Sequence, residues 1–296
     1  MQIPTNAFYD RATQSMRGLT VQADSLQTQI STGKKLSAPS QNTAAYQRLA
    51  TLKQAGADSD AYGTNLSLAG SLLASADTTL GAMSSQLQRA SELTLQARNG
   101  TQNDSSRKAI SDELDQIVES LVALGNTRDP RGQPLFGGVE GGAAVTKANG
   151  GYSFANTPLT AIPIGDAQSV QATEPAARVF AAGGTDILTA LTAFSTALKA
   201  GGDIDSAATT ALGDIAASSQ QVDTVQASLG ARAARVDLEQ SQQKSASTDR
   251  ETVRSSLEDT DIATAITQLQ KTMTILSATQ ASFSKLSSLT LFNYIK

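Results

Sequence analysis

The sequence has no cysteine, no histidine and no tryptophan, and aromatic residues make up only 4% of its 296 residues. Without cysteine and histidine the chain cannot form the usual zinc or iron–sulfur sites, or a histidine-activated serine or cysteine nucleophile. So few aromatic side chains suit thin helical seams better than a thick globular core. We therefore expect no cofactor and no metal site.

Charge and hydropathy exclude further classes of partner. The net charge is −4, and lysine and arginine form no cluster, which argues against nucleic acid as a partner. No run approaches the roughly 18 apolar residues of a membrane span, so no membrane insertion is expected. The first residues show no basic region followed by an apolar core, so an exported protein would need a machine other than the ordinary secretory one.

The two ends of the chain carry matching heptad patterns. The N-terminal set is Ala12, Met16, Leu19, Ala23, Leu26, Ile30 and Gly33. The C-terminal set is Ile262, Ile266, Leu269, Met273, Leu276, Gln280 and Phe283. Spacings of four and three place each set on one face of a helix, the a/d seam of a coiled coil. The sequence therefore predicts paired terminal helices.

The N-terminal seam is too thin to stand alone. Each of its four large apolar side chains contributes roughly 1.5–3 kcal/mol when buried, whereas ordering the backbone costs about 1–2 kcal/mol per residue. We therefore expect these helices to fray in the free chain and to become ordered in an assembly; an ordinary intramolecular bundle stays open as the alternative. The predicted assembly interface consists of Met16, Leu19, Leu26, Ile30, Ile262, Ile266, Leu269, Met273, Leu276 and Phe283.

The middle of the chain predicts a nested organisation. Apolar seams indicate helices over residues 43–98, from Asp104 or Ser105 to Gly125, over 186–199, and from about 203 toward 256. Between them, glycine, proline and short β-like runs that include Leu135–Phe136 and Arg178–Phe180 indicate a small β-rich region, of which residues 141–150 should tolerate deletion.

The expected fold is mainly α: an elongated multi-helix bundle with paired N- and C-terminal coiled-coil helices and a small β-rich insertion. Residues 1–42 with 257–296 would form the coiled-coil assembly domain. Residues 43–135 with 186–256 would form the helical bundle domain, and residues 136–185 an exposed insertion.

Three groups of residues could suggest chemistry, and each has a simpler interpretation. Asp259 and Asp261 lack the further ligands of a calcium loop and fit the N-terminus of a helix. The acidic group at residues 112–115 shares one short helix, where a solvated face is expected. The glycine-rich residues 136–142 match neither common phosphate-binding pattern. We therefore expect a protein that is not an enzyme.

Several segments in order resemble the flagellin superfamily. Residues 30–36, Ile-Ser-Thr-Gly-Lys-Lys-Leu, resemble the stretch after its first terminal helix, and residues 256–263, Ser-Leu-Glu-Asp-Thr-Asp-Ile-Ala, resemble the start of its last. Residues 229–232 are similar to its C-terminal bundle helix. Residues 133–138 and 287–295 resemble the hook–filament junction proteins within that superfamily.

The resemblance implies a structural subunit of the bacterial flagellum that joins the hook-side junction to the filament. The implied partners are copies of itself, the hook-side junction protein, flagellin and a cytoplasmic export chaperone. The implied location is the extracellular flagellum, reached by flagellar type III export without a cleaved signal peptide. A filament flagellin remains as the alternative, with an intracellular coiled-coil interaction protein and an enzyme carried by the insertion as more distant ones.

Overall fold

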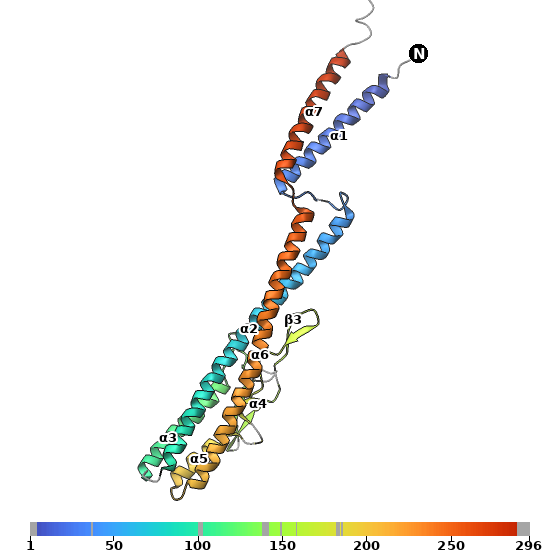
Figure 1. Cartoon of the computed structure of the whole chain (residues 1–296). Helices are drawn as coiled ribbons and strands as arrows, with labels where there is room; N and C mark the ends of the chain where they lie inside the picture. The colour runs from blue at the N-terminus through green and yellow to red at the C-terminus, as the bar shows by residue number, and fades with distance from the viewer. Residues whose placement is uncertain are drawn as a thin grey trace, which may run out of the picture. The chain divides into compact units, whose positions relative to one another are not determined.

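The computed structural model describes residues 5–36, 38–99, 103–137, 142–148, 150–157, 159–181, 184 and 186–288. In this part of the chain seven helices and two small sheets form a mainly helical fold, which confirms the predicted fold class (Figure 1). Contacts divide the chain into a terminal unit, residues 1–58 with 245–296, and a bundle unit, residues 59–244. The sequence-based domain boundaries after residues 42 and 256 stay a prediction.

Helix ends follow the local sequence signals closely. Helix α2 spans Thr43–Arg98, as the sequence predicted. Helix α3 spans Asp104–Gly125, but its N-cap is Asn103, whose side chain accepts a 2.8 Å hydrogen bond from the Ser106 amide, rather than Asp104 or Ser105. Helix α5 (Ile187–Ala200) ends at Gly201, whose φ of 75° glycine adopts without strain. Helix α6 spans Asp205–Glu258.

The terminal unit is built on two helices from opposite ends of the chain. Helix α1 (Thr5–Thr32) packs against helix α7 (Ile262–Ser288). They run antiparallel, because Tyr9 near the start of α1 contacts Phe283 near the end of α7. The terminal unit also contains the first residues of α2 and the last residues of α6. The pairing of the chain's two ends is therefore present within a single copy.

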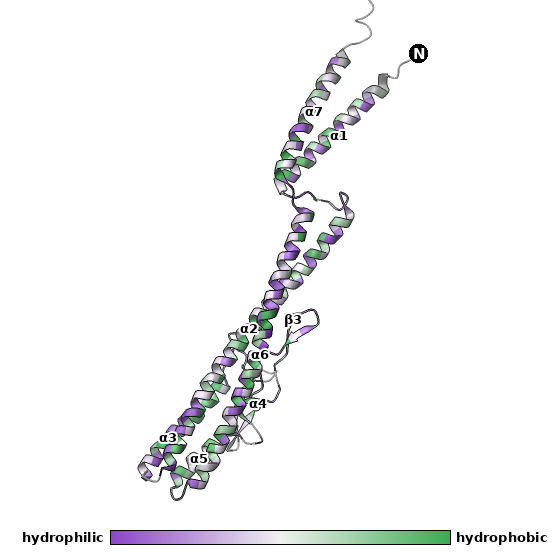
Figure 2. Ribbon diagram, in the orientation of Figure 1, coloured by the Kyte–Doolittle hydropathy of each residue, from purple (hydrophilic) through white to green (hydrophobic). Residues whose placement is uncertain are grey.

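The bundle unit holds the main hydrophobic core. Figure 2 shows hydrophobic residues, in green, interspersed with hydrophilic residues, in purple, along the long helices. Leucine and alanine side chains of α2 meet α3, α5 and α6 in one continuous cluster. Its fully enclosed members include Leu66, Leu80, Leu114 and Leu188. The aromatic members of this cluster are Phe136, Phe180 and Phe194, and most of the others are aliphatic.

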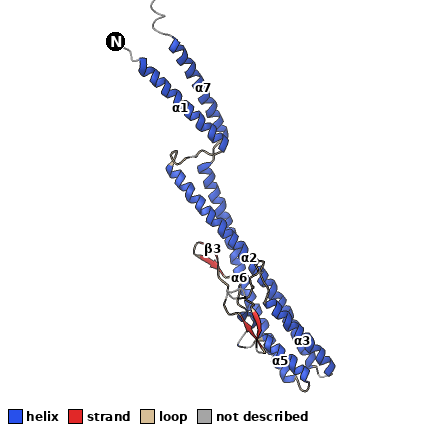
Figure 3. Cartoon of the chain, turned by 180° about the vertical axis from the view of Figure 1, so that it is seen from behind, coloured by secondary structure: helices blue, strands red, loops and turns tan. Residues whose placement is uncertain are grey.

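The insertion forms two hairpins and one short helix. Strand β1 (Val145–Ala148) pairs antiparallel with β2 (Gly151–Phe154). Strand β3 (Ile162–Gly165) pairs antiparallel with β4 (Gln168–Val170). Helix α4 spans Ala176–Phe180. Figure 3 shows the strands gathered along one side of the bundle's long helices.

Two sequence-based expectations for the insertion are wrong. Arg178–Phe180 is helical rather than β-like, because Val179 and Phe180 bury their side chains against the bundle from one turn of α4. Leu135–Phe136 lies outside the strands, in the segment after an isolated bridge between Arg128 and Pro134. Their apolar pattern signalled burial, which a short helix or a turn can satisfy as well as a strand.

The insertion is also more deeply built into the molecule than the sequence suggested. Val145 and Ile164 from its two hairpins belong to the bundle's core, and the rings of Phe154 and Phe180 stack with centroids 5.5 Å apart. Residues 141–150 therefore include Val145 of strand β1, which is 2% exposed, and are a poor site for deletion; residues 138–141 and 149 lie outside the described residues.

Hydropathy gives no membrane-spanning helix. None of the described helices combines the length and the apolar character needed to cross a bilayer.

Candidate assembly interface

Helix α1 presents one face to helix α7. Of the predicted α1 residues, Leu26 is buried, and Met16, Leu19 and Ile30 are half-buried. Tyr9 extends the contact, since its ring meets that of Phe283 edge to face at 5.5 Å. The structure thus brings the α1 seam onto α7. That the pair frays in the free chain stays a prediction.

Helix α7 carries two apolar faces rather than one. The face toward α1, here called the α7 seam, consists of Ala265, Leu269, Thr272, Leu276 and Phe283. The second face, here called the α7 stripe, consists of Ile262, Ile266 and Met273, which are 49%, 41% and 49% exposed. At 3.6 residues per turn, the stripe lies about 80° around the helix from the seam.

The predicted α7 set is therefore split between the two faces. Leu269, Leu276 and Phe283 belong to the seam, whereas the other three large residues lie on the exposed stripe. Sequence reasoning missed Ala265 and Thr272, which continue the four-three spacing of Leu269 and Leu276. Their small side chains add little hydrophobicity, so only the spacing could have revealed them.

A clasp joins the inner ends of the two terminal helices. We use this name for residues 33–35 and 258–260. The Lys35 amide donates to the Glu258 carbonyl at 2.7 Å, and the Thr260 amide donates to the Gly33 carbonyl at 2.9 Å. Lys34 forms an ion pair with Glu258, and the Lys35 ammonium donates to the Ser256 carbonyl at 2.6 Å.

The clasp brings together two segments that resemble the flagellin superfamily. Residues 30–36 and 256–263 are far apart in sequence but meet here through backbone and charge contacts. The hydrogen bond from Lys34 lowers the pKa of Glu258, burial opposes the shift, and Arg254 adds to the lowering. The carboxylate of Glu258 thus stays ionised between two cations.

The acidic pair at the start of α7 has a structural role. The Asp261 carboxylate accepts hydrogen bonds from the amides of Ala263 and Thr264 at 3.1 and 3.2 Å, the geometry of an N-cap. Hydrogen bonding from the Thr264 hydroxyl is the main cause that lowers the pKa of Asp261. Asp259 accepts from the Ser255 hydroxyl at 2.6 Å. No metal-binding cluster of three or more acidic residues occurs among the described residues.

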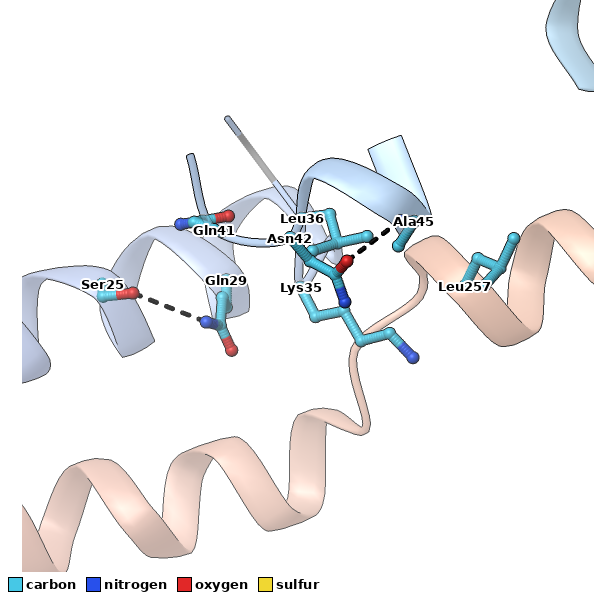
Figure 4. A pocket seen from close by; sticks show the side chains of 8 residues that line it. All are labelled: Ser25, Gln29, Lys35, Leu36, Gln41, Asn42, Ala45 and Leu257. Carbon is cyan, nitrogen blue, oxygen red and sulfur yellow. Dashed lines mark hydrogen bonds between the residues drawn. The ribbon is translucent and has the colours of Figure 1, made fainter. Parts of the chain in front are cut away.

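A cavity of about 590 Å³ lies beside the clasp (Figure 4). It is lined by Ser25, Gln29, Lys35, Leu36, Gln41, Asn42, Ala45 and Leu257. The Asn42 side chain accepts from the Ala45 amide at 3.0 Å and so caps α2, while Gln29 donates to Ser25 at 3.5 Å. The lining has one charged group, the Lys35 ammonium, and no carboxylate beside it. This arrangement offers neither an acid–base pair nor a metal-ligand set.

Two carboxylates of the acidic group on α3, Glu113 and Asp115, form ion pairs while staying 45% and 38% exposed. Asp115 forms an ion pair with Lys199 and accepts a 2.6 Å hydrogen bond from Ser195, both on α5. Burial alone would raise the pKa of Asp115, but the bonds from Lys199 and Ser195 outweigh it and lower the pKa. Glu113 pairs with Arg89 of α2 at 2.7 Å. These carboxylates contact neighbouring helices, and as partly exposed ion pairs they contribute little to stability.

Comparisons with known proteins agree with this architecture. The family model for the bacterial flagellin N-terminal helical region matches residues 3–140, and that for the C-terminal helical region matches residues 212–295. Flagellar hook-associated protein 3 of Salmonella typhimurium is 31% identical over 164 residues, which cover 54% of this chain and 51% of that protein. The flagellin of Listeria monocytogenes is 26% identical over 145 residues, covering 49% of this chain and 50% of that protein.

The matched region spans about half the length of these curated relatives. Among solved structures, FlgL of Xanthomonas campestris superposes with a TM-score of 0.63 at 18% identity, covering 69% of this chain and 99% of that one. At that identity the likeness shows a shared fold.

Proposed function

This chain belongs to the bacterial flagellin family, and we propose that it is a structural subunit of the flagellum that joins the hook side to the flagellin filament. The α7 stripe is the observation that carries the proposal. It leaves three large apolar side chains half-exposed beside the α1–α7 contact, as expected of a surface that another subunit covers.

The stripe suits repeated assembly. Covering each half-exposed side chain contributes about 1 kcal/mol. A neighbour that covers the stripe with a different surface of its own would make a heterologous contact, and heterologous contacts build rings or helical filaments. Met16, Leu19, Leu26, Ile30, Leu269, Leu276 and Phe283 would then hold the two helices of each subunit together.

The name of the Salmonella relative supports the place we assign to the chain. We infer that its partners are copies of itself, the hook-side junction protein, flagellin and a cytoplasmic export chaperone. We infer further that it reaches the extracellular flagellum through the flagellar export apparatus. Its role would be mechanical rather than catalytic.

A pair of variants tests the role of the stripe. Met273→Asp places a charge on the stripe, whereas Thr274→Asp places the same charge on the exposed neighbouring residue that faces away from α1. Each is expressed in a strain that lacks this protein. Burying an unpaired charge costs several kcal/mol. We therefore expect Met273→Asp to be exported and folded, yet to leave hooks without filaments and flagellin in the medium.

The control should restore filaments. Circular dichroism of the purified variants should show the same helix content and main melting temperature, because Met273 is exposed in the single copy. Normal filaments with Met273→Asp would overturn the proposed role of the stripe. Intact filaments without any copy of this chain would overturn the junction function itself.

Filament flagellin is the second candidate, since the Listeria flagellin matches at 26% identity. The amount of protein in purified flagella separates the two. A junction subunit is present in a small fixed number per flagellum, whereas a flagellin increases in proportion to filament length. Quantitative mass spectrometry of flagella sheared to different lengths gives the answer.

A further inference from the structure

The α7 stripe has no cover within its own chain among the described residues. Helix α1 occupies the α7 seam, about 80° away around the helix. The one large apolar side chain that α1 exposes in its described part is Val21, 68% exposed, on the far side of α1 from Leu26. The surface that covers the stripe must therefore come from elsewhere.

The eight residues that follow α7 have a composition that fits an apolar surface. Their sequence is Leu-Thr-Leu-Phe-Asn-Tyr-Ile-Lys, residues 289–296. Five of the eight are large apolar or aromatic residues: Leu289, Leu291, Phe292, Tyr294 and Ile295. In a chain with only 4% aromatic residues, two of these five are aromatic. Burying such a segment against a partner surface lowers the free energy, because apolar side chains are removed from water.

Simple reach prevents residues 289–296 from covering most of the stripe of their own copy. From Ile266 to Ser288 the helix rises about 33 Å at 1.5 Å per residue, and from Ile262 about 39 Å. Eight fully extended residues span at most about 27 Å. The segment therefore cannot turn back to Ile266 or Ile262 while α7 remains helical.

We propose that residues 289–296 of one copy pack on the α7 stripe of a second copy. This inference rests on the proposed function, since it requires copies that assemble. The stripe from Ile262 to Met273 is about 17 Å long. This length lies between the about 12 Å that eight residues span as a helix and the about 27 Å that they span when extended.

The contact joins two different surfaces and so repeats from copy to copy. The segment leaves one end of α7, and the stripe occupies the other end. Each copy therefore offers one segment and one free stripe, and adding a copy leaves a new stripe exposed for the next. Such a contact extends an assembly along one direction.

Cross-linking tests the proposal directly, because the chain has no cysteine of its own. Two variants are co-expressed in the strain that lacks this protein: Ile266→Cys with one affinity tag, and Ile295→Cys with another. Flagella are purified and oxidised mildly, and disulfide-linked dimers that carry both tags are measured. The control pairs Val21→Cys with the same Ile295→Cys. Leu291→Cys replaces Ile295→Cys in a second series to allow for register.

We expect the Ile266 pair to give at least about tenfold more mixed-tag dimer than the Val21 pair, as the higher local thiol concentration of a specific contact requires. A yield no higher than that of Val21 in both series, with normal flagella, would overturn this inference and leave the proposed function intact. Absence of the wild-type chain from purified flagella would overturn both. Disulfide-linked dimers of two Ile266→Cys copies, formed in place of the mixed-tag dimer, would assign the stripe to a symmetric contact. That result would also overturn the inference.

Discussion

The terminal unit and the bundle unit are both helical, but they bury very different amounts of apolar surface. The bundle unit holds one continuous core that runs from Leu66 to Val236. In the described part of the terminal unit the buried apolar residues are Ala23, Leu26, Ala265 and Leu276. The terminal unit nevertheless carries most of the exposed large apolar residues: Val21, Tyr46, Ile262, Ile266, Met273 and Ile275.

This difference predicts which unit opens first. We expect the continuous core of the bundle unit to keep it folded in a single copy, whereas the terminal unit leaves large apolar side chains in water. Regions with few buried contacts open at lower free energy than the core. We therefore expect the terminal unit to open locally while the bundle unit stays folded.

Core truncations should give the largest contrast between the units. Leu114→Ala removes a fully buried side chain from α3 and should cost about 2–5 kcal/mol, because the loss of transfer free energy adds to a cavity. Leu26→Ala removes the same group from α1, where the seam is thin. Calorimetry should show a lower main transition only for Leu114→Ala. Equal shifts for both would show that the two units unfold as one cooperative body.

Substitution of the glycine at the end of α3 should have an intermediate effect on the stability of the bundle unit. A Cβ atom at Gly125 would lie 2.6 Å from Val145 Cγ2 and 2.9 Å from Phe180 Cε2, so both insertion side chains would have to move. Gly125→Ala should therefore destabilise the bundle unit by about 1–3 kcal/mol, as overpacking does. Thermal unfolding measures the change.

The matched control for this substitution is Gly63→Ala on α2, where nothing lies within 4 Å of the added Cβ. Alanine favours helix over glycine by about 1 kcal/mol, so this variant should be neutral or more stable. If Gly125→Ala is as stable as Gly63→Ala, the insertion does not pack tightly on α3.

Much of this contrast could be predicted from the sequence. The four-three spacing gave the terminal pair, and the apolar seam with its flanking signals gave α2 its bounds of Thr43–Arg98. Local sequence signals predicted secondary structure best where the apolar pattern was long and periodic. They failed at Arg178–Phe180, because one basic residue followed by two apolar residues fits a helical turn as well as a strand.

The remaining features depend on which helix faces meet in the folded structure. No spacing could show that α7 divides its apolar residues between two faces, because both faces share the heptad period and the choice depends on where α1 lies. The contacts of Asp115 with α5 depended on which face of α3 meets that helix. The clasp joins segments more than two hundred residues apart, so only the family resemblance of each pointed to a shared role.

The smallest predicted effect is an opening of the clasp, within the terminal unit, as the pH falls. The pKa of Glu258 lies below its ordinary value of 4.5, first because Lys34 bonds to the carboxylate and also because Arg254 does, against the effect of burial. A lowered pKa means that the closed clasp prefers the ionised carboxylate. Its contribution is therefore complete above pH 4.5 and is lost as the pH falls through the lowered value.

Lys34 is half exposed, so solvent screens the pair and the contribution should be no more than about 1 kcal/mol. Hydrogen exchange of the Lys35 and Thr260 amides, which donate across the clasp, reports its opening locally. On acidification below pH 4.5, protection of these amides should fall in the wild type after correction for intrinsic exchange. In Glu258→Gln protection should be lower already at neutral pH and should change less with acid, since one titrating partner is gone. An identical pH profile in both proteins would show that Lys34 and Glu258 do not hold the clasp closed, and that its backbone pairing alone does.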